Sequence, residues 1–348
     1  MGRAAVSPRV DEAGLWSAAL AGDRRAFATV TETYRRELQV HCYRMLGSLE
    51  DAEDMVQETF LRAWRRRETF RGRSTVRAWL YGIATNASLD ALESRSRRLL
   101  PTVVTPAADP LAVPPPASEV DWLEPYPDRL LDGVADGDDG PAETVVARET
   151  IELAFLVAIQ QLPARQRAVL ILRDVLGWNA RETALVVATT VIAVNSALQR
   201  ARETLRRHLP AQRLDWTRSD GTDADEQSLL ERYMDAWRRT DVDGLVALLA
   251  EDARFAMPPT PAWYSGRDAI GVFLTTHPFA ATASRHIHVP TRANRQPAFA
   301  VFLAGAPGAP PRPFALEVLR VHDGLIAEID VFLQPKLLER FAVTPPNE

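Results

Sequence analysis

The chain has 348 residues, 46% of them apolar, and its 41 basic residues against 46 acidic ones give a formal net charge of −5. This length exceeds one typical domain, so we expect two or three domains, each with its own core. No apolar run approaches the roughly twenty residues of a membrane-spanning helix, and no signal-peptide pattern opens the chain, which favours a cytoplasmic protein without a membrane partner. The single cysteine, Cys42, excludes an internal disulfide and a cysteine-rich metal site.

The positive charge is almost entirely arginine, since Lys336 is the only lysine, and it gathers in two places. A net negative charge argues against a simple nucleic-acid coat protein, but clustered charge outweighs the average. Guanidinium groups suit planar contacts with phosphate and guanine, although a GC-rich genome would produce the same bias. The arginine content leaves both explanations open.

The N-terminal part of the chain predicts helices. Residues 1–10 have the composition of a disordered leader, and apolar residues from Asp11 to about Arg44 predict two helices with a break at Gly22–Asp23. In the next helix a buried stripe recurs at helical spacing: Leu46, Leu49, Val56, Phe60 and Ala63. The opposite face is mostly acidic, and by periodicity alone it is a solvated surface. Its members are Asp51, Asp54, Gln57, Glu58 and Leu61.

The sign of the charge reverses within one turn of this helix. Seven arginines follow, opposed only by Glu68: Arg62, Arg65, Arg66, Arg67, Arg71, Arg73 and Arg77. Their mutual repulsion would be relieved by a polyanion. A further helix, from Val76 to about Arg98, carries Trp79, and an aromatic ring beside arginines can stack on an unpaired base. Core packing is the alternative for Trp79, and one ring can serve both purposes.

The string DAEDMVQETFLRAWRRRETFRG followed by TVRAWLYGIATNASLDALESRSRR resembles region 2 of the sigma-70 family, above all its extracytoplasmic-function (ECF) group. The resemblance implies that the acidic helix binds the clamp helices of the largest RNA polymerase subunit. It also implies that the loop and second helix capture a base flipped out of the melted −10 element. The implied polymerase-binding residues are Asp51, Asp54, Gln57, Glu58 and Leu61. The implied −10-binding residues are Arg71, Arg73, Ser74, Arg77, Trp79, Asn86, Arg95, Arg97 and Arg98.

Residues 99–142 change character, because their density of proline excludes regular helices and strands and is typical of a flexible linker. The string VDWLEPYPDRLLD at 120–132 is too apolar for a plain spacer, and its acids alternate with candidate anchors. These anchors are Trp122, Leu123 and Tyr126. Similar sigma factors thread this linker through the polymerase active-site and RNA-exit channels. The resemblance therefore implies that its acidic residues stand in for an RNA backbone there. WLEPYPD also resembles a string of the subgroup that carries an extra C-terminal domain.

Residues 143–210 predict a compact helical domain. A three-residue turn, Ala188-Thr189-Thr190, separates ARETALVV from VIAVNSALQRARETLRRHL, which is a helix-turn-helix pattern with a basic tail. The residues expected to face inward are Val191, Val194, Leu198, Ala201 and Leu205. LPARQRAVLILR together with NSALQRAR resembles sigma region 4, which reads the −35 element and contacts the polymerase flap. The implied −35-binding residues are Thr189, Thr190, Asn195, Ser196, Gln199, Arg200 and Arg202. Such turns usually contain glycine, so Ala188 leaves the turn geometry open.

Residues 225–348 predict an α+β domain. Two short helices and a strand come first, then a helix from Ser265–Gly266 to about Thr276. Strands follow at roughly 285–293, 297–304, 313–321 and 325–333, and Asp323–Gly324 is a tight hairpin signal. Helices followed by a curved antiparallel sheet, with the string MPPTPAWYSGRDAIGVF, resemble the SnoaL-like (NTF2-like) cone fold. The same fusion occurs in the sigma-G-like and sigma-J-like subgroups.

Cone folds enclose an apolar pocket, and some members perform acid–base chemistry there. The candidates in this chain are Tyr264, His286, His288, Glu317, Glu328 and Asp330. One face of an antiparallel sheet commonly faces water, and acidic side chains are usual on that face, so we expect these acids to be exposed. His286 and His288 lack a third ligand at convincing spacing, which favours core or surface histidines over a metal site. We therefore predict that this domain has no catalytic set of residues, no metal and no cofactor. We predict instead a regulatory module that docks on the sigma domains or the linker and is open to a small-molecule ligand.

The sequence thus predicts two all-α domains, sigma region 2 at 11–98 and region 4 at 143–210, joined by the linker at 99–142, and an α+β cone domain at 225–348. The predicted function is a sigma factor, not an enzyme, that binds core RNA polymerase and directs promoter-specific initiation, tuned in cis by the C-terminal domain. The alternative is a one-component ligand-sensing regulator that binds duplex DNA without polymerase. A third hypothesis is an isomerase or hydrolase with DNA-binding appendages.

Overall fold

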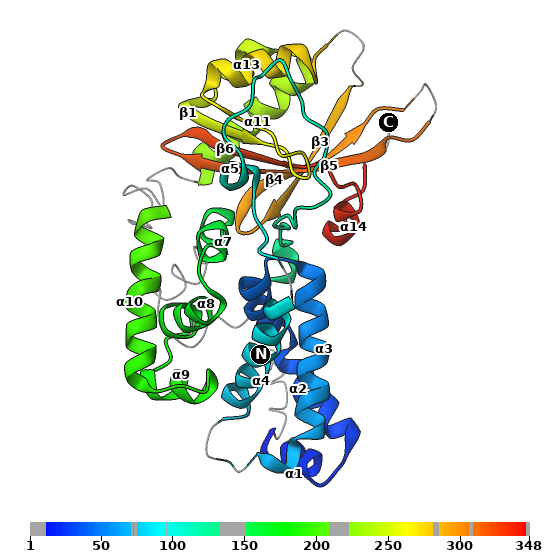
Figure 1. The fold of residues 1–348 in the computed structure, drawn as a ribbon. Coiled ribbons are helices and arrows are strands. Elements are labelled where there is room, and N and C mark those ends of the chain that lie inside the picture. Colours follow the sequence, from blue (N-terminus) through cyan, green and yellow to red (C-terminus); the bar gives the residue numbers. More distant parts are fainter. Residues whose placement is uncertain are drawn as a thin grey trace, which may run out of the picture. The chain divides into compact units, whose positions relative to one another are not determined.

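The computed structural model describes residues 12–70, 72, 75–94, 96–131, 151–208, 223–280, 285–305 and 309–345. The predicted leader lies outside these residues, as do the end of the predicted linker and Val145. The chain divides into two compact units (Figure 1). The first unit holds residues 1–94 and 164–198, and the second holds residues 95–163 and 199–348.

The first unit is helical. Its helices are α1 (Glu12–Leu20), α2 (Arg24–Leu46), α3 (Leu49–Arg65), α4 (Val76–Ser94), α8 (Ala164–Leu170), α9 (Ala180–Val186) and the first part of α10 (Val191–His208), with the short helices η1 (Arg67–Thr69) and η3 (Ile171–Val175). The predicted break at Gly22–Asp23 is confirmed, because the Asp23 carboxylate caps α2 by accepting from two N–H groups. Cys42 is buried, and burial raises the pKa of its thiol to about 12.

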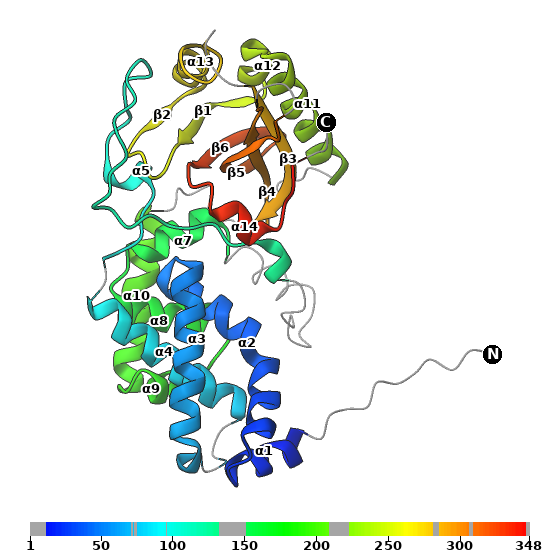
Figure 2. The same cartoon turned by 90° about the vertical axis from the view of Figure 1, so that its right-hand side faces the viewer.

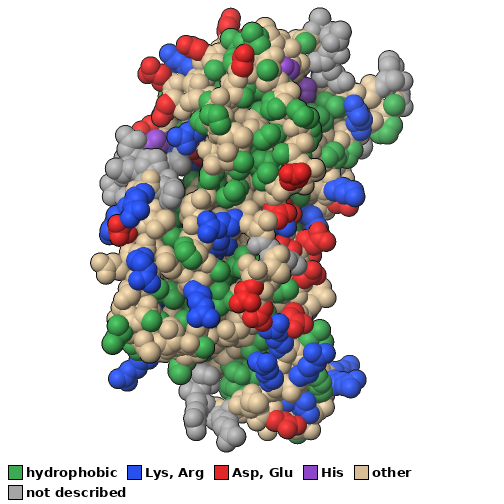
Figure 3. All heavy atoms as spheres, viewed as in Figure 1, with side chains coloured by type: hydrophobic (Ala, Val, Ile, Leu, Met, Phe, Trp, Pro, Cys, Tyr) green, Lys and Arg blue, Asp and Glu red, His purple; other side chains and the backbone are tan. Residues whose placement is uncertain are grey.

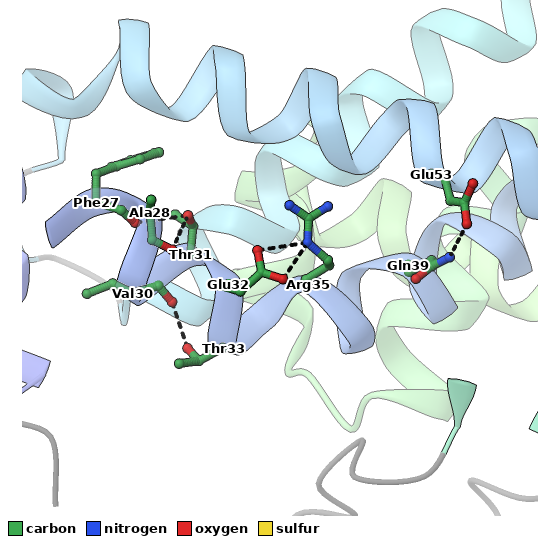
Figure 4. A network of polar contacts seen from close by, with 9 residues as sticks. All are labelled: Phe27, Ala28, Val30, Thr31, Glu32, Thr33, Arg35, Gln39 and Glu53. Carbon is green, nitrogen blue, oxygen red and sulfur yellow. Dashed lines mark hydrogen bonds and ion pairs between the residues drawn. The ribbon is translucent and has the colours of Figure 1, made fainter. Parts of the chain in front are cut away.

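The connection between α2 and α3 consists of two neighbouring capping residues, Gly47 and Ser48. Gly47 ends α2 in the left-handed conformation at φ 74°, where its N–H donates to Tyr43, and Ser48 then caps α3 by accepting from the N–H of Asp51. The two helices are also joined by side chains, since the Gln39 amide donates to the Glu53 carboxylate across 3.4 Å (Figure 4). Helices α2 and α3 therefore pack side by side as an antiparallel pair.

The second unit contains a six-stranded sheet. Its strands are β1 (Leu249–Ala256), β2 (Trp263–Ser265), β3 (His286–Ala293), β4 (Gln296–Leu303), β5 (Arg312–His322) and β6 (Leu325–Phe332), in the order β2-β1-β6-β5-β4-β3. Its helices are α5 (Pro101–Val104), η2 (Asp128–Leu130), α7 (Leu153–Gln160), the end of α10, α11 (Asp223–Arg239), α12 (Val242–Val246), α13 (Arg267–Thr276) and α14 (Leu337–Phe341). The four strands predicted at the C-terminal end are confirmed within one residue at each boundary.

The expectation of an antiparallel sheet holds for four of the five pairings between the named strands and is wrong for one. Strand β1 pairs with β6 in parallel, because the chain enters the sheet at β1 and returns to that edge only after the β3–β6 meander. The hairpin signal is confirmed, since Asp323 and Gly324 both have positive φ, at 50° and 73°, as a tight two-residue turn requires. Figure 2 shows α11 and α12 lying alongside the sheet. Their apolar residues pack against the sheet in one hydrophobic core, among them Tyr233 and Trp237 of α11 and Leu245 of α12.

The expectation of a linker without regular structure is wrong in part. Pro101 opens the short helix α5, at a position where its missing N–H costs nothing. Beyond α5 the linker binds the third domain: the N–H of Ala108 donates to Trp263 at 2.8 Å, and the indole N–H of Trp263 donates to Thr105 at 2.8 Å. Figure 2 shows this segment beside β2 and β1.

Across the part of the chain that the structure describes, no single helix is long and apolar enough to cross a membrane. The bent pair of α9 and α10 meets the length and composition requirement.

Candidate nucleic-acid interface

The acidic face of α3 is presented to solvent. Asp54 and Gln57 are exposed, and Leu61 keeps 52% of its surface accessible. The opposite stripe of the helix is buried, including Ala52, Val56 and Ala63. The division of α3 into a core face and a presented face follows the prediction, except that Phe60 of the predicted stripe is only half-buried and that Asp51 and Glu58 are half-buried on the other side. The polymerase-binding role of these residues stays a prediction.

Charge along α3 follows the helix dipole, with acids in the first turn and arginines in the last. Figure 3 shows acidic side chains above basic ones over this part of the surface. Glu58 is not free, since Arg62 binds it at 2.6 Å and also binds Asp90 of α4 at 2.6 Å. Arg62 therefore forms ion pairs within α3 and between α3 and α4.

Trp79 packs against aromatic rings of the first unit. Its ring lies 5.8 Å from Trp16 and 5.4 Å from Phe70, both edge-on, and its side chain is only half-buried. One edge therefore belongs to the core and another reaches solvent, which matches the double use that the sequence allowed. Stacking on a base stays a prediction.

Two of the predicted −10-binding arginines are engaged inside the chain. Arg77 donates to Glu37 at 2.7 Å and lies over the ring of Tyr81. Arg98 donates to the main-chain carbonyl of Trp122 and lies 3.5 Å from Glu124, so it holds the linker. Arg97 is exposed. The remaining residues of the predicted set, Arg71, Arg73, Ser74 and Arg95, lie outside the described residues.

Asn86 is used by the neighbouring helix-turn-helix. Its amide donates to Gly82 of its own helix at 2.8 Å and to the carbonyl of Val186 in α9 at 3.1 Å. Beside it, the ring of Tyr81 lies 5.7 Å from that of Trp178. The surface of α4 predicted to capture the −10 element is thus in contact with α9, a relationship that no short-range sequence pattern signals.

The helix-turn-helix is built by local chemistry. Asn179 and Glu182 form a capping box at the start of α9. Ala188 has φ 49°, the left-handed conformation that glycine adopts without strain. The turn therefore keeps the glycine-type geometry with alanine in its place, which answers the question that the sequence left open.

The recognition helix α10 buries Val194, Leu198, Ala201 and Leu205, as predicted. The expectation for Val191 is wrong, because it stands at the helix start beyond the core and remains 38% exposed. Of the predicted −35-binding residues, Ser196 is half-buried and the others are exposed: Thr189, Thr190, Asn195, Gln199, Arg200 and Arg202. These residues form one presented face, and its contact with DNA stays a prediction.

The predicted linker anchors Trp122, Leu123 and Tyr126 are all buried. Tyr126 is held by the β3–β4 turn of the third domain, where Asn294 accepts its N–H at 2.7 Å and returns a main-chain hydrogen bond at 2.9 Å. Asn294 also donates to Ile151, just before α7, at 2.8 Å. One buried asparagine at φ 56° therefore joins the linker, the lead into α7 and the cone domain. Sequence reasoning missed it, although an Asn-Arg pair between two strands is a turn signal.

The cone interior contains a polar cluster. Tyr233 of α11 donates to Oε2 of Glu317 at 3.2 Å, and Nε2 of His288 lies 3.2 Å from the same oxygen. The expectation that the acids are exposed is wrong for Glu317 and Asp330, which are both buried. They lie on opposite faces of the sheet, since Glu317 pairs with Val331 and Asp330 with Val318, and α11 covers Glu317 through Tyr233. The His288 side chain is buried, and its ring lies 4.7 Å from that of Trp237 in a tilted arrangement. Burial raises the pKa of Tyr233 well above its ordinary value, and the charge of Glu317 adds to that shift.

The other candidates in the cone are dispersed. Glu328 binds Arg320 at 3.1 Å and lies 3.9 Å from Arg254. The Tyr264 ring stacks on Phe273, and burial with the charge of Asp109 raises the pKa of its hydroxyl to about 12. Burial lowers the pKa of His286. No group of three or more metal-binding side chains occurs among the residues that the structure describes.

Three family models match the chain. Sigma-70 region 2 matches residues 30–98, sigma-70 region 4 matches residues 152–205, and the SnoaL-like domain matches residues 230–329. The ECF RNA polymerase sigma factor SigG of Mycobacterium tuberculosis is 43% identical over 325 residues, which is 93% of this chain and 85% of that protein. The chain belongs to the ECF sigma factors of the sigma-70 family.

Other relatives match either the sigma regions alone or the whole chain with its SnoaL-like domain. The ECF sigma factor SigW of Bacillus subtilis is 30% identical over 188 residues, covering 54% of this chain and 91% of its own length. The crystal structure of the M. tuberculosis ECF sigma factor SigJ covers 90% of this chain and 98% of its own, with 22% identity and a TM-score of 0.56. That likeness supports the fold of the whole ECF sigma factor, including its SnoaL-like domain.

Proposed function

We propose that this ECF sigma factor binds core RNA polymerase through the acidic face of α3, opens the −10 element with α4, and reads the −35 element with α10. The observation that carries the proposal is the presented face of α3, where Asp54, Gln57 and Leu61 are exposed at one side of a helix whose other side is core. A regulator that binds duplex DNA alone has no use for such a face. Charge on an exposed rim speeds association with a basic partner and sets its orientation.

We further propose that the SnoaL-like domain regulates initiation by holding the linker. Support comes from Asn294, which binds Tyr126 and Ile151, and from Arg295, whose N–H donates to Asp128 at 2.8 Å. These contacts flank residues 132–150 on both sides. A linker held in this way has to leave the third domain before it can enter a polymerase channel. The cone domain acts here without catalysis, as a cytoplasmic regulatory module.

A small-molecule ligand of the cone domain is part of the proposal, supported by the buried cluster of Tyr233, His288 and Glu317. A buried carboxylate beside an imidazole and a hydroxyl is costly to desolvate, and such a cluster is a frequent feature of ligand sites. Ala108 of the linker packs against the core that contains Tyr233, so a ligand bound at this cluster would change the contact between the linker and the cone domain.

The test is run-off transcription with purified core polymerase and the full chain on promoter fragments selected from genomic DNA. Initiation that depends on the added chain supports the proposal. If the chain neither starts transcription nor competes for core polymerase, while it binds duplex DNA tightly, the ligand-sensing regulator takes its place. An Asn294→Gly chain in the same assay reports the regulation, because it removes the side-chain hydrogen bonds to Tyr126 and Ile151. A released linker is expected to change the amount of transcript.

A further inference from the structure

The first turns of α10 carry an apolar side chain in an unusual place. Ile192 is 79% exposed, although isoleucine is among the residues most often buried. It stands two positions into the helix, immediately after the turn formed by Ala188, Thr189 and Thr190. A large exposed aliphatic group at this point does not contribute to the core, which is served by Val194 and the buried residues that follow it.

Ile192 lies on the same stripe as the predicted base-reading residues. Asn195, Ser196 and Gln199 follow it at three, four and seven positions, so the four side chains line one side of α10. In a helix-turn-helix the N-terminal residues of the second helix meet base edges in the major groove. Ile192 is the member of the stripe nearest to that end, and Arg200 and Arg202 stand farther along the helix, where they suit phosphates.

The chemistry of the groove restricts what Ile192 can recognise. Its side chain has no donor or acceptor, and the apolar group that the major groove presents is the C5 methyl of thymine. Burying two aliphatic surfaces against each other is favourable, whereas placing Ile192 against a carbonyl or amino edge leaves that polar group without a partner.

We propose that Ile192 is a specificity-determining residue that contacts the C5 methyl of a thymine in the −35 element. The inference rests on the proposed function and deepens it, because it adds an apolar contact to the polar ones already assigned to α10. It also accounts for the exposure of Ile192 in the free protein, where this surface has no core to cover.

The experiment replaces each thymine of the −35 region, one at a time and on either strand, by deoxyuridine, which removes only the methyl group. Full-length chain and core polymerase are assayed for the promoter concentration that gives half-maximal run-off transcript. With the natural side chain we expect one substitution to raise that concentration about 4-fold, the effect of burying one methyl-sized group. Ile192→Ala is expected to bind the unmodified promoter more weakly and to make no distinction between thymine and deoxyuridine at that position. Ile192→Val is expected to retain part of the distinction.

The matched control is Leu185→Ala. Leu185 is also aliphatic and is 83% exposed, but it belongs to α9 and lies off the α10 stripe. It should keep the full distinction between thymine and deoxyuridine. Equal loss of the distinction in both variants would assign the effect to the domain as a whole and overturn the proposal.

The result with unmodified promoter separates the two levels of the argument. Absence of initiation by the unaltered chain overturns the sigma-factor proposal and this inference together. Normal initiation with no thymine whose methyl matters overturns the inference alone. A methyl effect that persists unchanged in Ile192→Ala has the same meaning, since another residue then makes the contact.

Discussion

The side-chain amide of Asn86 in α4 donates a hydrogen bond to the main-chain carbonyl of Val186 in α9 at 3.1 Å. Asn86 is also a predicted −10-binding residue, and one amide group cannot serve a flipped base and Val186 in the same geometry. Both printed hydrogen bonds of Asn86 use its NH2 group, one to Gly82 and one to Val186. We predict that this group leaves Val186, and that α9 loosens from α4, when Asn86 donates to a flipped base.

We expect a complex with core polymerase and a single-stranded −10 oligonucleotide to loosen α9. Hydrogen exchange of the amides in residues 183–187, followed by mass spectrometry, measures this directly. Exchange should speed up in the complex relative to the free chain, because the packing of α9 on α4 is lost. A −35 duplex without the −10 strand is the control. Unchanged exchange in a complex that has bound the −10 strand would show that α4 reads DNA with α9 in place.

Reversing one charge on α3 is expected to weaken binding to core polymerase. Asp54→Arg places a cation on the acidic face and should lower the affinity by about 10-fold, mostly through slower association. The effect should shrink at high salt, where exposed charges are screened. Glu93→Arg, which reverses an exposed acid on α4, is the matched control. Equal affinity of the two variants in a competition assay would remove the acidic face from the interface.

Asn294 offers a test of the hold on the linker. Asn294→Gly keeps the left-handed turn and the main-chain hydrogen bond to Tyr126 but removes the two side-chain hydrogen bonds, to Tyr126 and Ile151. Each lost buried hydrogen bond costs about 1–3 kcal/mol. We expect faster cleavage between residues 105 and 131 in limited proteolysis. Asp323→Gly makes the same kind of change in the β5–β6 turn, away from the linker. It should leave the cleavage pattern unchanged, and identical patterns in both variants would contradict a specific hold.

The buried His41 imidazole makes stability depend on pH. Burial, with smaller contributions from the charges of Arg44 and Arg77, lowers its pKa from 6.5 to about 3. As the pH falls below 6.5 the unfolded chain takes up a proton at His41, whereas the folded chain stays neutral until about pH 3. The stability due to neutral His41 is therefore complete above pH 6.5 and is lost below it, by about 1.4 kcal/mol per pH unit.

This prediction is measured by urea unfolding at pH 7.0, 5.5 and 4.5. His41→Gln should flatten the fall in the free energy of unfolding relative to the unaltered chain. His322→Gln, at a half-exposed site, should follow the unaltered chain. Parallel curves for all three proteins would contradict a neutral buried imidazole.

Glu317 tests whether the cone cluster binds a ligand or only supports the fold. Glu317→Gln keeps the volume and an acceptor for Tyr233 but removes the charge beside His288. We expect a change in thermal stability of a few degrees together with altered transcript yield in the run-off assay. Tyr233→Phe, which removes only the donated hydrogen bond, is the comparison. A stability change without any effect on transcription in either variant would assign the cluster to the fold alone.

The amino-acid sequence by itself determined the local elements and their faces. The acidic side of α3, the capping box before α9 and the hairpin turn at Asp323–Gly324 each depend on residues within a few positions of one another. Helical and strand periodicity, caps and turn residues are short-range signals of this kind. The dense motifs over regions 2 and 4 then indicated membership of the sigma-70 family.

Only the tertiary structure decided which predicted contacts are already taken within the chain. Tyr126 and Asn294 are 168 positions apart, and Asn86 and Val186 are 100 apart. The parallel pairing of β1 with β6, the burial of Glu317 and the exposure of Ile192 likewise depend on which elements meet. Such contacts arise from the packing of whole faces, and the spacing of residues along the chain carries no information about which distant face will cover them.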